Sequence, residues 1–95
     1  MRTRNTWKTR ELESALASKG FEPLDADHTW YRLYNGGRRT DIRTKVSHGI
    51  PEYGRNLLKK MADQMHLNRR ELDQFMECPL TRDGYVELLE KRGHL

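Results

Sequence analysis

Two histidines, His28 and His48, are the side chains of this sequence best suited to acid–base chemistry. His28 opens a run of β-forming residues, and His48 comes just after a second such run. If the two runs pair as a hairpin, both imidazoles can lie near each other at one edge of a sheet. Imidazole titrates near neutral pH, so one ring could act as general base on a ribose 2′-OH and the other as general acid on a phosphodiester. The alternative is that both are ordinary surface or turn histidines.

Positive charge is concentrated in one part of the chain, although the net charge is only +4. Residues 1–31 have equal numbers of acidic and basic side chains, residues 32–60 have eight basic and two acidic ones, and residues 61–95 have five basic and seven acidic ones. A local excess of this size is typical of a surface that binds a polyanion. The residues predicted to contact nucleic acid are Trp30, Arg32, Tyr34, Arg38, Arg39, Arg43, Lys45, Lys59 and Lys60.

A β-hairpin is predicted to carry most of these side chains. Residues 28–34 and 39–46 flank Asn35-Gly36-Gly37, a strong signal for a tight turn. Because side chains alternate along a strand, one side of the hairpin is largely apolar, and the other carries His28, Trp30, Arg32, Tyr34, Arg39, Arg43 and Lys45. If helices cover only the apolar side, bases can stack on the rings and phosphates can bind the guanidinium groups. Alternatively, the C-terminal helices bury Trp30 and Tyr34.

The elements around the hairpin predict an α+β fold. They are a helix from Thr6 or Thr9 to Lys19, a strand at 21–25, a helix from Pro51 to about Leu67, a helix opened by a capping box from Asn68 to Glu71, and a helix capped by Thr81 that ends at Gly93. We therefore expect one domain, residues 1–95. Its core, residues 8–67, has the order α-β-β-β-α, with two helices on one face of a three-stranded antiparallel sheet. Two further helices, residues 68–95, extend it.

Composition narrows the class of protein. No apolar run is long enough to cross a membrane, and the basic N-terminus is not followed by the apolar stretch of a secretory signal. A single cysteine, Cys78, cannot form an internal disulfide, which favours a reducing, cytoplasmic location. The histidines, acidic residues and cysteine have no recognisable metal-ligand spacing, so neither a metal nor a cofactor is expected.

Several short segments together resemble a known family. These are Lys8-Thr-Arg-Glu-Leu12, Lys19-Gly-Phe21, His28-Thr-Trp-Tyr31, Thr40-Asp-Ile-Arg-Thr-Lys-Val46 and Ser47-His48. Their order resembles that of the HicA-type mRNA interferase toxins, over about residues 8–67. The resemblance implies a core like that of double-stranded-RNA-binding domains and ribosome-independent cleavage of mRNA without a metal. It also implies that His28 is catalytic and that the partner is a HicB-type antitoxin.

Three functions remain open from the sequence. The first is a HicA-like endoribonuclease, and the second is an RNA- or DNA-binding module without catalysis on the same fold. The third is a protein-interaction adaptor whose interface is formed by residues 68–95. A helix-turn-helix in this last segment is disfavoured because the segment is net acidic, which is unfavourable for contacts with phosphates.

Overall fold

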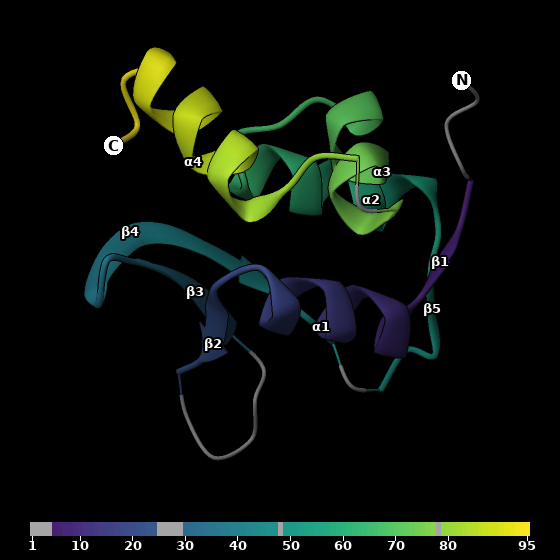
Figure 1. Cartoon of the computed structure of the whole chain (residues 1–95). Helices are drawn as coiled ribbons and strands as arrows, with labels where there is room; N and C mark the ends of the chain where they lie inside the picture. The colour runs from purple at the N-terminus through teal and green to yellow at the C-terminus, as the bar shows by residue number, and fades with distance from the viewer. Residues whose placement is uncertain (1–4, 25–29, 48, 78) are drawn as a thin grey trace.

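A computed structural model describes residues 5–24, 30–47, 49–77 and 79–95 of the chain. Over these residues the fold is α+β, as expected, with a three-stranded antiparallel sheet and four helices (Figure 1). The elements in order are β1 (Trp7–Lys8), α1 (Thr9–Ser18), β2 (Phe21–Pro23), β3 (Trp30–Asn35), β4 (Arg38–Lys45), β5 (Glu52–Tyr53), α2 (Arg55–Gln64), α3 (Arg69–Glu77) and α4 (Arg82–Lys91).

The main sheet has the strand order β2-β3-β4, and the hairpin between β3 and β4 is confirmed. Gly36 and Gly37 both have positive φ, 61° and 78°, as the two central residues of a tight hairpin turn require. A bulge lies near Thr40, whose hydroxyl donates to the carbonyl of Leu33 at 2.8 Å and accepts from the N–H of Ile42 at 3.1 Å. It shifts the pairing by two residues, and an even shift leaves each side chain on its original side of the sheet.

One side of this sheet forms the core. Its side chains Tyr31, Leu33, Ile42 and Thr44 are buried, and the three apolar ones join a single cluster with buried residues of the helices. The last two helices contribute Leu72, Phe75, Met76, Tyr85 and Leu89 to that cluster. Residues 68–95 therefore pack against the same side of the sheet as the rest of the core.

A second, two-stranded sheet lies at the end of the molecule away from the hairpin turn (Figure 1). Here β1 pairs antiparallel with β5, and the carbonyl of Pro51 accepts from the N–H of Thr9 at 2.9 Å. The prediction that Pro51 begins a helix is therefore wrong. The residues after it pair with β1, and α2 begins only at Arg55 after the N-cap Gly54. Neither short strand was predicted.

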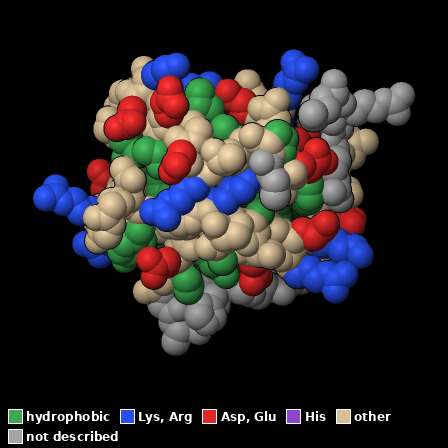
Figure 2. Space-filling model, in the orientation of Figure 1, with side chains coloured by type: hydrophobic (Ala, Val, Ile, Leu, Met, Phe, Trp, Pro, Cys, Tyr) green, Lys and Arg blue, Asp and Glu red, His purple; other side chains and the backbone are tan. Residues whose placement is uncertain are grey.

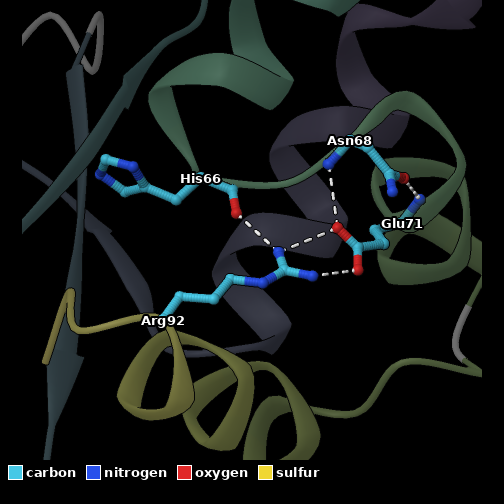
Figure 3. Close-up of polar contacts among 4 residues, drawn as sticks. All are labelled: His66, Asn68, Glu71 and Arg92. Carbon is cyan, nitrogen blue, oxygen red and sulfur yellow. Dashed lines mark hydrogen bonds and ion pairs between the residues drawn. The ribbon is translucent and has the colours of Figure 1, made fainter.

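A polar cluster fixes the end of α4 to the start of α3 (Figure 3). Asn68 and Glu71 form the predicted capping box, with bonds of 2.9 and 2.7 Å. Arg92 donates to both carboxylate oxygens of Glu71, at 3.0 and 2.5 Å, and to the carbonyl of His66 at 3.0 Å. The hydrogen bond from Arg92 lowers the pKa of Glu71, and the backbone bond from Asn68 adds to this effect.

We expect Glu71→Gln to make folding stability less dependent on pH. A carboxylate whose pKa is lowered by folding stabilises the native state above its unfolded pKa, near 4.3, and this contribution is lost as the pH falls through the folded pKa. The variant should lose about 0.3–1 kcal/mol at pH 7 and less at pH 3, by urea unfolding. Glu87→Gln is the control, since Glu87 only approaches Lys91 to 3.8 Å at an exposed site. Equal losses for Glu71→Gln at both pH values would contradict the expectation.

Candidate nucleic-acid interface

The side of the main sheet opposite the core carries a group of aromatic and basic side chains, which we call the open face. Trp30, Arg32 and Tyr34 of β3 are half-buried there, and Arg39, Arg43 and Lys45 of β4 are exposed. The open face exists because the alternation along both strands sends Tyr31, Leu33, Ile42 and Thr44 into the core. The structure thus brings these six predicted contact residues to one side of the sheet.

The register places a cation beside each aromatic ring. Trp30 pairs with Lys45 and Tyr34 pairs with Arg39 across the two strands. In addition, the guanidinium carbon of Arg43 lies 5.0 Å from the centroid of the Trp30 ring, within the range of a cation–π contact. Rings and cations in this arrangement can stack bases and bind phosphates at neighbouring positions.

The middle of the open face contains a pair of like charges. Arg32 and Arg43 are direct partners in the register, and like charges directly opposite each other destabilise a sheet. Glu22 of β2 is on the other side of Arg32 in the same row. The Nε atom of Arg32 is buried and has no hydrogen-bond partner within the described part of the chain. An anion bound beside Arg32 and Arg43 would offset the repulsion between them.

The other predicted contact residues lie at the margins of this face or outside the described ranges. Arg38 is exposed at the hairpin end, opposite Asn35. Lys59 and Lys60 are exposed neighbours on α2, and only Lys60 lines the cleft described next. His28 and His48, the two predicted catalytic residues, lie outside the described residues.

A cleft of about 320 Å³ adjoins the open face, between Trp30 and Lys45 of the sheet and helix α2. Its other lining residues are Ser47, Tyr53, Leu57, Lys60, Met61 and Gln64. Tyr53, Leu57 and Gln64 were not predicted as site residues. Tyr53 was expected inside a helix. Leu57 and Gln64 lie near Trp30 only because α2 packs beside β4, and no local sequence pattern predicts that packing.

On the side seen in Figure 2, Lys and Arg side chains are interspersed with Asp and Glu. The described residues contain no group of three His, Cys, Asp or Glu side chains placed to bind a metal ion. In the same part of the chain, no helix has the length and apolar character needed to cross a bilayer.

Comparisons with known proteins leave the resemblance to the HicA-type toxins as a prediction. No family model, curated protein or solved structure matches the chain.

Proposed function

We propose that this protein binds single-stranded RNA on the open face of its sheet. The observation that carries the proposal is the pairing across β3 and β4, in which Trp30 and Tyr34 each have a cation opposite and Arg32 faces Arg43. Base–aromatic stacking contributes about 1–3 kcal/mol per base, and guanidinium groups bind phosphate oxygens in a bidentate manner. A surface that has both groups in alternation suits a strand whose bases are exposed.

The single strand is favoured over a duplex by the same groups. In a duplex the bases are stacked on one another, so Trp30 and Tyr34 would have no ring to stack on. DNA single strands offer the same rings and phosphates, and only contacts with the 2′-OH distinguish the two. Binding of RNA and DNA of the same sequence should therefore be compared directly.

We expect the affinity for a single-stranded RNA to fall steeply with salt. With three or four phosphates neutralised by the cations of the open face, the log–log slope of affinity against salt should be about −2 to −3. Fluorescence anisotropy of a labelled, unstructured RNA between 50 and 200 mM salt measures this slope. A salt-independent affinity, or no binding at 50 mM salt, would exclude the open face as an RNA-binding surface.

A second proposal is that the protein also cleaves the RNA, as the resemblance to the HicA-type toxins implies. One observation favours it: Trp30, two residues after His28, and Ser47, the residue before His48, line the same cleft. In this proposal His28 and His48 exchange protons with the 2′-OH and the leaving oxygen, and a HicB-type antitoxin is the partner.

The cleavage proposal predicts that His28→Ala abolishes RNA cleavage without weakening RNA binding. Loss of a general acid or base reduces the rate by about 10²–10⁴-fold. Purified protein and the variant should be incubated with mixed RNA in EDTA, and products followed by gel electrophoresis. If the variant cleaves as fast as the parent, the catalytic role of His28 is refuted, whereas binding without any product supports a purely RNA-binding protein.

A further inference from the structure

The cleft beside the open face has a size and lining that suit one small polar ligand. Its volume of about 320 Å³ is at the lower end of the usual range for small-molecule pockets, about 300–1,000 Å³. The indole of Trp30 and the aliphatic side chains of Leu57 and Met61 provide apolar contact surface. Met61 is buried, whereas Leu57 and Trp30 are partly exposed, so a planar ring can reach this surface from solvent.

Tyr53 holds one wall of the cleft in place. Its hydroxyl accepts from the N–H of Ser47 at 2.9 Å and donates to the carbonyl of Lys45 at 3.0 Å. The ring itself is buried, with 3% of its surface exposed. Tyr53 therefore fixes the backbone on both sides of Val46, so the position of Lys45 and Ser47 in the cleft is set before any ligand binds.

The side-chain amide of Gln64 has its oxygen fixed by two hydrogen bonds. Its Oε1 atom accepts from the hydroxyl of Thr44 at 2.6 Å and from the N–H of Lys45 at 3.2 Å. Because a backbone N–H can only donate, the atom facing it must be the amide oxygen, and the NH₂ group must point elsewhere. No bond from this NH₂ group to another described residue exists in the structure, so its two hydrogens can donate to a ligand in the cleft.

The charge of the cleft favours an anion. Lys45 and Lys60 approach it from the sheet and from α2, and both side chains are exposed. None of the described residues that line it is acidic. These groups match the parts of a nucleotide. The ring and the aliphatic side chains can stack on the base, the amide can donate to acceptors of the base or ribose, and the two ammonium groups can bind the phosphate.

We propose that this cleft binds one nucleotide of a single-stranded RNA, with its base against Trp30 and its phosphate between Lys45 and Lys60. This inference rests on the proposed RNA binding by the open face. It adds that one unstacked nucleotide of the strand lies in the neighbouring cleft. A free nucleotide has the same chemistry, so the experiment must separate the two sources.

The neighbouring lysines of α2 provide a matched test. Both Lys59 and Lys60 are exposed, and the sequence predicted nucleic-acid contacts for both, but only Lys60 lines the cleft. The cleft therefore gives a role in binding the nucleotide to Lys60 and none to Lys59. We expect Lys60→Ala to weaken binding of a six-nucleotide RNA about 3- to 10-fold, as expected for loss of one partly exposed charged contact, and Lys59→Ala to change it less than twofold. Labelled RNA and fluorescence anisotropy measure both affinities in the same buffer.

Tryptophan fluorescence distinguishes the free nucleotide from the RNA. Trp7 is buried, so quenching by added UMP reports mainly on Trp30. Saturable quenching by UMP that Lys60→Ala weakens and Lys59→Ala does not would show that the cleft takes free nucleotides as well. The same Lys60 effect on the hexanucleotide alone would show that the nucleotide must belong to a strand.

Two results would overturn the inference. One is an equal effect of the two lysine variants on both probes, and the other is inorganic phosphate competing as well as UMP or the hexanucleotide. If the hexanucleotide still binds with the expected salt slope in these cases, the open face remains the binding surface and only the nucleotide cleft is refuted. If the hexanucleotide does not bind at 50 mM salt, the proposed function fails as well.

Discussion

A chain that ends at Leu67 is expected to lose its cooperative unfolding transition. The removed helices provide Leu72, Phe75, Met76, Tyr85 and Leu89 to the core. Full burial of each large apolar side chain contributes about 1.5–3 kcal/mol, so the loss approaches the whole stability of a small domain, about 5–15 kcal/mol. Circular dichroism with thermal melting measures the transition.

Two contacts in the remaining part make this loss more severe. Phe21 packs against the rings of Phe75 and Tyr85, with centroids 6.1 and 6.0 Å away, and would become exposed. The buried ammonium group of Lys19 donates to the carbonyls of Phe75 and Leu80 and would lose both acceptors. Loss of these two bonds adds to the loss of apolar contacts.

A shorter truncation is the control for this experiment. A chain that ends at Arg92 lacks only exposed residues and keeps the contact between Arg92 and Glu71, so its transition should stay cooperative. If the chain ending at Leu67 melted like the full chain, residues 68–95 would be a separable extension. If instead the shortened chain loses its transition, the deletion has removed part of the core. Loss of a binding partner by that shortened chain would then not be evidence for an adaptor function of residues 68–95.

The double variant Arg43→Glu and Lys45→Glu is expected to weaken binding of single-stranded RNA about 10- to 100-fold at 100 mM salt. Both side chains are exposed on the open face, and Arg43 also lies over the ring of Trp30. Reversal removes two phosphate contacts and adds repulsion of the strand. The log–log salt slope should become flatter by about 1.4, which is the contribution of two phosphates in a single strand.

This experiment needs a control that separates the effect of the net charge from the effect of where the changed charges lie. The control variant, Arg10→Glu and Arg70→Glu, changes two exposed arginines on α1 and α3 and lowers the net charge from +4 to 0, as the test variant does. It should bind RNA within about threefold of the parent at 100 mM salt, because charges beyond a Debye length of about 10 Å are largely screened. Equal weakening by both double variants would indicate a nonspecific effect of net charge and contradict binding at the open face.

The sequence determined the features that depend on neighbouring residues. Asn35-Gly36-Gly37 specified the turn because glycine accepts positive φ without strain, and both glycines have it. The strict alternation along β3 and β4 then decided which side chains share the open face. Helix ends marked by side-chain hydrogen bonds were also predictable: Asn68 and Glu71 cap α3, and the hydroxyl of Thr81 accepts from the N–H of Gly84 at the start of α4.

Only the tertiary structure decided the features that depend on contacts distant in the sequence. The two-residue strands β1 and β5 are too short to show any periodicity, and each forms only because the other is present. That pairing keeps Pro51 out of the helix and brings Tyr53 against Lys45. The cleft arises in the same way, since Trp30 and Lys60 are thirty residues apart and meet only because α2 packs beside β4. Local propensity acts over a few residues, whereas burial of a common core decides which distant elements meet.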